Sequence, residues 1–317
     1  MKILHITNNY PTENFPIFGI FVKEQIDSLS QTGTYSKVFF INGKENGKLE
    51  YVESILKLRK FLKKNNFDII HCHHVFSAII FILTGFSSKV PSIVSFQNDP
   101  VDESFFNLFR IIKHFTTAWI FKNNSCYVDR IRGFYLPNGV DTDFFRPINR
   151  EEACNKIGLD PKKIYILFVS SNYLRKQKRY DRYQSIISEL KKWDNKIEEL
   201  KLINTERSLV PYFFNASSLH LLTSDFEGSP NSVKEALSCN IPVISTNVGN
   251  VKDLIENVHG SYCASGNDDY ELIDLCKKSL SKIIIPNSRD KLIEKGYDMN
   301  SVAIKLKNIY NKTLDIK

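Results

Sequence analysis

The chain has 317 residues, 42% of them apolar and 25% charged, which is typical of a globular protein large enough for two domains. No apolar run reaches the roughly 18 residues of a membrane-spanning helix, and the first residues lack a signal-peptide layout, so we expect a cytoplasmic protein. The net charge of +8 favours anionic partners, and six cysteines without a Cys-x-x-Cys pair predict reduced thiols rather than a zinc site or disulfides.

Short apolar runs rich in β-branched and aromatic residues alternate with segments of helical spacing along the chain. In chain order, the predicted strands are 3–6, 38–41, 69–71, 93–96, 164–170, 200–203, 219–223 and 242–245. Strands that are apolar throughout and alternate with helices predict parallel sheets covered by helices on both faces. Because this series restarts near residue 164, we predict an α/β protein with two Rossmann-like domains.

The segment PNGVDTDFFRP, residues 137–147, combines an Asn-Gly turn with two prolines and predicts the domain boundary. We therefore expect one domain over residues 1–146 and a second over residues 147–298. In the remaining segment, 299–317, apolar residues recur at the spacing of one helix face: Val302, Leu306, Ile309 and Tyr310. This spacing predicts a helix and leaves open whether it packs on the first domain.

The segment EGSPNSVKEAL, residues 227–237, directly follows a predicted strand. Ser229 suits a helix cap and Pro230 the first helical position, so a helix is predicted to begin at the carboxyl end of a parallel strand. The free amides of such a helix end favour a diphosphate. We expect five residues to line this anion site: Gly228, Ser229, Pro230, Asn231 and Ser232.

Two glutamates, Glu227 and Glu235, flank this helix start with seven residues between them. Glu227 would lie in the turn before the helix. Glu235 would lie inside the helix, where its carboxylate could accept hydrogen bonds from two neighbouring hydroxyls such as those of a ribose. An ordinary helix cap followed by a solvated glutamate is the alternative explanation.

This segment resembles the Glu-x7-Glu signature of family 4 retaining glycosyltransferases, which have the GT-B fold of two facing Rossmann-like domains. The resemblance continues, in the order of the family's motifs, through PIFGIFVKEQIDSL, DIIHCH, PNGVD and HGSYC, and covers most of the chain. It implies retaining transfer from a nucleotide-sugar donor, commonly a UDP-sugar, without a metal or other cofactor. It further implies a glycan or lipid-linked acceptor held by the first domain, commonly in surface-polysaccharide assembly, with Glu227 on the transferred sugar.

A second motif, VSSNYLRKQKRYD at residues 169–181, follows the first strand of the second domain. The family places an arginine and a lysine here to bind the donor diphosphate, and Arg175 and Lys178 are the candidates for these catalytic positions. Four cations occur within five positions, and the spacing departs from the commoner Gly-Arg-x-x-x-x-Lys-Gly form. A solvated basic turn is the alternative explanation.

In the first domain, Gly19 matches a family glycine whose loop lets the backbone approach the donor phosphates or the acceptor. His73 matches the second histidine of the family's His-x-His strand end, which implies a catalytic position near the reacting sugar. The row His71 to His74 does not predict a metal site, because adjacent histidines on a strand point to opposite faces. A flexible loop glycine and a structural histidine are the alternatives.

Several features depart from the family pattern or imitate other patterns. Gln97 and Asn98 stand where the family often has a histidine and a glycine, and the stretch 116–135 is shorter than usual. Asp141-Thr142-Asp143 imitates the Asp-x-Asp metal motif of another glycosyltransferase fold, but its position between the domains indicates turn and cap chemistry. These departures concern the acceptor side more than the donor side.

Two other functions compete with sugar transfer, and two more are disfavoured. A nucleotide-sugar 2-epimerase would use the same donor pocket, and a non-catalytic GT-B partner protein would fit the departures in the first domain. A Rossmann oxidoreductase is disfavoured because no Gly-x-Gly-x-x-Gly follows the first strand, and nucleic-acid binding because RNP-type aromatics and zinc spacings are absent.

Basic residues interleaved with apolar ones at 56–64 and 105–121 favour peripheral contact with anionic membranes, or else ordinary helices with one buried face.

Overall fold

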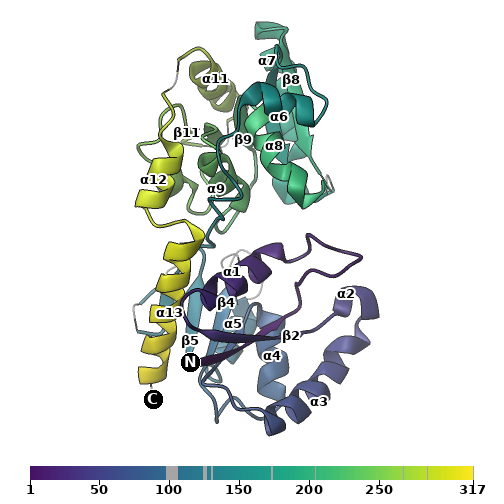
Figure 1. The fold of residues 1–317 in the computed structure, drawn as a ribbon, viewed down its shortest axis with the longest axis vertical. Coiled ribbons are helices and arrows are strands. Elements are labelled where there is room, and N and C mark those ends of the chain that lie inside the picture. Colours follow the sequence, from purple (N-terminus) through teal and green to yellow (C-terminus); the bar gives the residue numbers. More distant parts are fainter. Residues whose placement is uncertain are drawn as a thin grey trace. The chain divides into compact units, whose positions relative to one another are not determined.

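The computed structural model describes residues 1–97, 106–123, 127–129, 131–172, 174–203, 205–266, 268–283 and 285–316. The chain divides into two compact units (Figure 1). Unit 1 comprises Met1–Gly139 and Met299–Lys317, and unit 2 comprises Val140–Asp298. Each unit contains one parallel sheet, which confirms the predicted α/β class of fold.

Unit 1 is built on a six-stranded sheet in the order β2-β1-β3-β4-β5-β6. Its strands are β1 (Lys2–Thr7), β2 (Tyr35–Phe40), β3 (Ile69–Cys72), β4 (Ser92–Phe96), β5 (Ala118–Phe121) and β6 (Gly133–Tyr135). Its helices are α1 (Ile20–Ser30), α2 (Gly43–Asn46), α3 (Leu49–Lys64), α4 (Val75–Leu83), α5 (Phe106–Ile112) and α13 (Met299–Asp315).

Successive residues of these strands point to opposite faces, and each face has its own core. Leu4 and Ile70 pack with α3, α4 and α5, whereas Ile3 and Ile69 pack with α1 and α13. Figure 1 shows α13 beside α1, and the Lys307 ammonium on α13 donates a 2.5 Å hydrogen bond to the Thr32 carbonyl just after α1. The segment that follows unit 2 in sequence is therefore part of the core of unit 1.

Unit 2 is built on a five-stranded sheet in the order β11-β10-β9-β7-β8. Its strands are β7 (Ile164–Val169), β8 (Ile197–Leu202), β9 (Leu219–Leu222), β10 (Val243–Ser245) and β11 (Tyr262–Cys263). Its helices are α6 (Arg150–Lys156), η1 (Lys176–Lys178), α7 (Tyr180–Trp193), η2 (Arg207–Leu209), α8 (Val210–Ala216), α9 (Asn231–Ser238), α10 (Val251–Ile255), α11 (Asp269–Leu280) and α12 (Ser288–Glu294). Helices α7 and α11 cover one face, and α8, α9, α10 and α12 cover the other.

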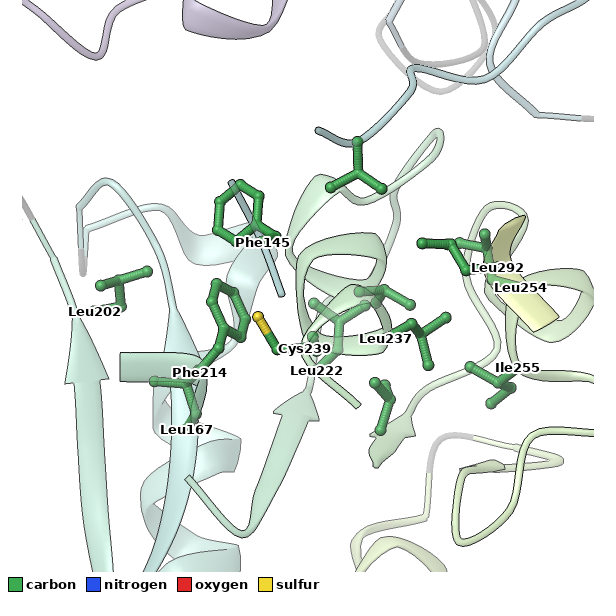
Figure 2. Packing of buried hydrophobic residues seen from close by; sticks show 14 of the residues in the cluster. Phe145, Leu167, Leu202, Phe214, Leu222, Leu237, Cys239, Leu254, Ile255 and Leu292 are labelled. Atoms are coloured by element: carbon green, nitrogen blue, oxygen red, sulfur yellow. The ribbon is translucent and has the colours of Figure 1, made fainter. Parts of the chain in front are cut away.

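The division between the units lies after Gly139, seven residues before the predicted boundary after Arg146. Val140 already belongs to unit 2, because its amide donates to the Tyr297 carbonyl at 3.0 Å. Phe145 is 1% exposed, and its ring meets that of Phe214 edge-on in the core of unit 2 (Figure 2). The proline and turn signals of this segment indicated a boundary but not which unit its two phenylalanines would enter.

The described cysteines are all free thiols, and four of the five are buried; Cys126 lies outside the described residues. Within the described part of the chain, no helix is long and apolar enough to cross a membrane.

Candidate functional site

The strand order of unit 2 creates a crevice between the carboxyl ends of β7 and β9. From β7 the chain continues to β8 on one side, whereas β9 pairs with β7 on its other side. In open parallel sheets, ligands bind where the strand order reverses in this way. The basic motif follows β7 and the motif with the two glutamates follows β9, so both predicted segments meet at this crevice.

Hydrogen bonds to backbone carbonyls join the loops that follow these two strands. The Thr223 hydroxyl donates to the carbonyls of Lys178 and Arg179, at 3.0 Å each. The Asp225 amide donates to the Gln177 carbonyl at 2.8 Å, and the Gln177 side-chain amide donates to the Phe226 carbonyl at 3.2 Å. The position of the basic motif is therefore determined by the loop that carries Glu227.

The side chains of Lys178 and Glu227 form an ion pair in this crevice. The Lys178 ammonium lies 2.5 Å from Glu227 Oε1, and the Ser224 hydroxyl donates to the same oxygen at 2.7 Å. Only 13% of the lysine side chain and 11% of the glutamate side chain are exposed. An ammonium has three donors, so Lys178 can bind an oxyanion while it stays paired with Glu227.

The other cations of the basic motif have different surroundings. Arg179 has a left-handed backbone (φ 50°) and forms ion pairs with Asp181 at 2.9 Å and Asp225 at 3.1 Å, and the hydrogen bonds with Asp181 raise the pKa of its guanidinium. It anchors the loop. Arg175 is exposed, and among the described residues its guanidinium donates one hydrogen bond, to the Gln177 side chain at 3.3 Å, so it remains available to a ligand.

The helix after β9 begins one residue later than predicted. Pro230 is the N-cap of α9 with no side-chain cap bond, so the prediction that Ser229 caps the helix is wrong. The reason is Lys234, a fully buried lysine whose ammonium takes the Ser229 hydroxyl as acceptor at 2.9 Å. With no side chain capping them, the first amides of α9 remain donors for an anion.

The two polar residues at the start of α9 point in different directions. The Ser232 hydroxyl lies 3.1 Å from Nε2 of buried His220, so this side chain faces the interior of unit 2 and not a ligand. The buried Oδ1 of Asn231 has no hydrogen-bond partner among the described residues. Because buried polar atoms are nearly always paired, Asn231 retains an acceptor that a ligand hydroxyl or amide could satisfy.

Glu235 is largely buried and pairs with Arg207, a residue that no sequence motif indicated. Arg207 Nη1 lies 3.3 Å from Glu235 Oε1, and the guanidinium packs over the rings of Phe144 and Phe145. Burial raises the pKa of Glu235, and the charge of Arg207 opposes this shift. Arg207 therefore orients the carboxylate and favours its ionised form, the form that accepts two hydroxyl hydrogen bonds.

Gly228, the residue after Glu227, is held by the loop that precedes α10. The Asn250 amide donates to the Gly228 carbonyl at 3.1 Å, and a Cβ on Gly249 would lie 2.2 Å from that same oxygen. Gly249 also has φ of +54°, a conformation that side chains rarely adopt. This contact fixes the turn between Glu227 and the start of α9, and sequence inspection did not identify it.

In unit 1, Gly19 lies at the start of α1 against the loop after β1. Its φ is +69°, and a Cβ there would lie 2.3 Å from the carbonyl of Asn9. The glycine is therefore required for packing of this loop, whatever role it has towards a ligand. The structure places Gly19 in unit 1 and the other predicted donor residues in unit 2.

His73 is 3% exposed and belongs to a buried cluster with His5 and His71. Residues 71 and 73 share a face of the strand, so the argument from adjacent histidines did not apply to this pair. The possible ligand atoms of the three histidines lie within 4.8 Å of one another. However, His5 Nδ1 and His73 Nε2 are hydrogen-bonded at 2.9 Å, and both His71 nitrogens are bonded, to Tyr310 and Ser95, at 2.7 Å each. The cluster is therefore a hydrogen-bonded network.

The remaining predicted features have local roles. Gln97 Oε1 accepts a 3.4 Å hydrogen bond from the Asn138 amide, and Asn98 lies outside the described residues. Asp141 Oδ1 accepts from the amides of Asp143 and Phe144 at 3.0 Å each, which is the predicted cap chemistry. The stretch 116–135, which looked shortened, still provides β5 and β6.

Comparison with known proteins gives two family matches. The family "Glycosyl transferase 4-like" matches residues 21–121, and "Glycosyl transferases group 1" matches residues 197–299. An Escherichia coli protein, UDP-Gal:alpha-D-GlcNAc-diphosphoundecaprenol alpha-1,3-galactosyltransferase, is 24% identical over 306 residues, covering 82% of this chain and 79% of its own. A probable sucrose-phosphate synthase of Thermosipho melanesiensis is 26% identical over 204 residues, covering 56% of this chain and 47% of its own.

Solved structures share the fold at low sequence identity. Sucrose-phosphate synthase from Thermosynechococcus elongatus has a TM-score of 0.78 at 11% identity, over 100% of both chains. Anabaena HepE in complex with UDP-glucose has a TM-score of 0.70 at 12% identity, over 98% of this chain and 99% of its own. Two parallel-sheet units and these neighbours define the GT-B fold. The family matches and the Escherichia coli relative support a glycosyltransferase that uses a nucleotide-sugar donor. Within that class, the two family matches and the Escherichia coli relative support the family 4 type.

The contact between Gly249 and Gly228 can be tested by substitution. Gly249→Ala should lower stability and weaken donor binding, because the methyl group displaces the Gly228 carbonyl and with it the turn after Glu227. Gly158→Ala is the matched control, since Gly158 has φ of +72° with nothing within 4 Å of an added Cβ. The control should show only backbone strain, about 1–2 kcal/mol.

Thermal unfolding and the donor KM of both variants provide the measurement. Equal losses of stability and unchanged donor KM in both variants would contradict a role for this contact in shaping the site.

Proposed function

We propose that this enzyme transfers a hexose from a UDP-sugar, with retention of configuration, to a glycan or lipid-linked acceptor in surface-polysaccharide assembly. The observation that carries the proposal is the arrangement at the crevice of unit 2. There, Lys178 pairs with Glu227, Arg175 belongs to the same basic motif, and the uncapped start of α9 lies between Glu227 and Glu235 in the sequence. The named relative that uses UDP-Gal and the neighbour solved with UDP-glucose support the choice of nucleotide.

Each group has a role in the proposed reaction. Breaking the bond between the sugar and the diphosphate places negative charge on the leaving group, and Arg175, Lys178 and the α9 amides stabilise that charge. Glu235, oriented by Arg207, accepts hydrogen bonds from the ribose hydroxyls. Glu227 accepts hydrogen bonds from the transferred sugar while it remains paired with Lys178. These protein cations replace a metal ion, so transfer proceeds without one, and unit 1 binds the acceptor.

A transfer assay tests the proposal. We expect UDP release with a new glycan product when the protein is given UDP-galactose or UDP-glucose and a short lipid diphosphate carrying N-acetylglucosamine. We also expect EDTA to leave the rate unchanged. Epimerised donor without a new glycan would indicate an epimerase. Loss of activity in EDTA that Mn²⁺ or Mg²⁺ restores would overturn metal independence.

Substitution of the two glutamates should change different kinetic constants. Glu235→Gln should mainly raise the donor KM, because ribose is held equally in the ground and transition states. Glu227→Gln should mainly lower kcat, because the sugar it contacts changes charge during the reaction. Each loss should be about ten- to a hundred-fold in kcat/KM, the equivalent of roughly 1.5–3 kcal/mol for a hydrogen bond to a charged group.

Steady-state kinetics separate these outcomes, and circular dichroism checks the fold. Glu198→Gln is the matched control, since this half-exposed carboxylate of unit 2 pairs with Lys191 away from the crevice. Near-normal kinetics in both site variants would reduce the spacing of the glutamates to a coincidence and contradict the proposed donor site.

Peripheral membrane contact is part of the proposal and rests on α3 and on the segment 105–121, of which residues 106–121 are described. One face of α3 is buried through Leu58 and Leu62, as expected of an ordinary helix with one buried face. A second row of apolar side chains, Leu49, Val52 and Leu56, is 63–74% exposed and lies on the same helix as exposed lysines. Exposed apolar and basic side chains on one helix favour anionic lipid.

Liposome flotation tests this contact. Lys60→Gln combined with Lys63→Gln should reduce recovery with anionic vesicles, by about 1 kcal/mol of binding free energy for each lysine. Lys191→Gln combined with Lys192→Gln on α7 of unit 2 is the matched control and should bind as the unsubstituted protein does. Equal recovery of the unsubstituted protein with neutral and anionic vesicles would contradict the proposal.

A further inference from the structure

Lys122 is a buried lysine that the fold and the donor site leave unexplained. It directly follows β5, and its side chain is 1% exposed. Its ammonium has no hydrogen-bond partner among the residues that the structure describes. Burying a cation without a partner is energetically costly, and buried cations in native proteins are nearly always paired. An unpaired one therefore marks a functional site in preference to a structural one.

The face of the sheet on which Lys122 lies is polar at its carboxyl end. Ala118 and Ile120 of β5 belong to the core beneath α1 and α13, and Lys122 continues this alternation on the same face. His71 of β3 is on that face too, because it bonds Tyr310 of α13, and His73 follows it two residues later. The carboxyl end of this parallel sheet therefore carries one cation and a row of imidazoles.

In the described part of the chain, the ionisable groups that face Lys122 are neutral at neutral pH. Burial lowers the pKa of His71 and His73, and the charge of Lys122 lowers both further. His5, bonded behind them, has a pKa lowered to about 3 by burial, and the Tyr310 phenol has a raised pKa. Burial alone lowers the pKa of Lys122 to about 7, with no carboxylate acting on it. A cationic ligand would be repelled here, whereas an anion would find an uncompensated positive charge.

Lys122 lies next to a partly exposed residue at the carboxyl edge of the sheet. The last paired residues of β4 and β5 are Phe96 and Phe121, so Gln97 and Lys122 are the next residues in register. Gln97 is partly exposed. Because the ammonium itself is buried, an anion would reach it by displacing side chains on the side of Gln97, at the carboxyl edge of the sheet.

We propose that Lys122 binds a phosphoryl group of the acceptor, so that the enzyme selects acceptors that carry a phosphate or diphosphate next to the accepting sugar. The anion site follows from unit 1 itself. The assignment of the phosphate to the acceptor rests on the proposed function, because the donor diphosphate is assigned to Lys178 and α9 in unit 2.

The anion site can be tested without any transfer reaction. The probe is P1,P2-dimethyl diphosphate, which resembles the diphosphate between a lipid and a sugar and keeps its charge through neutral pH. Calorimetry should show that Lys122→Met weakens its binding about ten- to a hundred-fold in a Lys178→Met background, where the donor cation is absent, and that Lys122→Arg retains it. Absence of binding in Lys178→Met alone, or binding that Lys122→Met leaves unchanged, would overturn the site.

Stability gives a second readout that a structural lysine would not produce. In the unfolded chain the Lys122 amine keeps its usual pKa of 10.5, whereas in the folded protein it loses its proton above about 7. The unfolded state therefore binds more protons between these values, so folding is least favoured at low pH and recovers as pH rises. Lys122→Met should melt at a higher temperature than the unsubstituted protein below pH 7, and the difference should shrink towards pH 9. A lower melting temperature for Lys122→Met would overturn the proposal.

Two acceptors that share one sugar, a lipid diphosphate and a neutral alkyl glycoside, test whether the phosphate bound by Lys122 belongs to the acceptor. Lys122→Met should raise the KM of the diphosphate acceptor about ten- to a hundred-fold and leave that of the glycoside unchanged. An equal rise for both acceptors would contradict phosphate recognition. Failure of both acceptors with the unsubstituted enzyme would contradict the proposed function, while the calorimetric result would still decide the anion site.

Discussion

The donor site depends on the attachment of one loop to another. The hydroxyl of Thr223, at the end of β9, holds the carbonyls of Lys178 and Arg179, which follow β7. Strand order alone brings the carboxyl ends of β7 and β9 side by side, but it does not determine where the loops beyond them lie. The Thr223 hydroxyl and the two hydrogen bonds of Gln177 fix the positions of these loops. As a result, the Lys178 ammonium lies 2.5 Å from the Glu227 carboxylate. Without them the basic motif would be a solvated turn.

Unit 2 places several charges out of solvent in a small region, and each has a specific partner. Lys178 pairs with Glu227, Arg207 with Glu235, and Lys234 with Ser229. Buried ion pairs add little net stability, because desolvation offsets most of their attraction. Their value here is preorganisation: carboxylates and cations are already oriented before a diphosphate or a sugar arrives. Lys122 in unit 1 differs, because no such partner accompanies it among the described residues.

Much of the sheet architecture could be predicted because buried parallel strands are continuous apolar runs. All eight predicted strands are present, with ends shifted by at most three residues. The missed strands are β5, β6 and β11. β5 lies in the segment 105–121, whose basic and apolar residues indicate a helix, and β11 has only two residues. The spacing of Val302, Leu306, Ile309 and Tyr310 marks the buried face of α13, but only the structure shows that this face packs on unit 1.

The site was predictable where residue type and local spacing determine the role, and not where a distant partner does. The two motifs lie at one crevice, where Lys178 pairs with Glu227, whereas Glu235 pairs with Arg207. The cap was misplaced because a buried lysine five residues later takes the Ser229 hydroxyl. Arg207 lies 28 residues from Glu235, and the Gly249 contact with Gly228 spans two loops, so neither leaves a local pattern. His5 likewise leaves no local pattern, since its partner His73 is 68 residues away.

The position of α13 has a consequence for synthesis of the chain. Unit 2 is one continuous stretch, from Val140 to Asp298, whereas unit 1 needs residues from both sides of it. As the chain leaves the ribosome, the sheet of unit 1 emerges first, but its face beneath α1 lacks α13, and Ile3, Ile69 and Ile93 remain partly uncovered. Unit 2 can complete its own core before that face is closed. The part of the protein made first is therefore the last to be finished, and until release its apolar face is a natural substrate for chaperones.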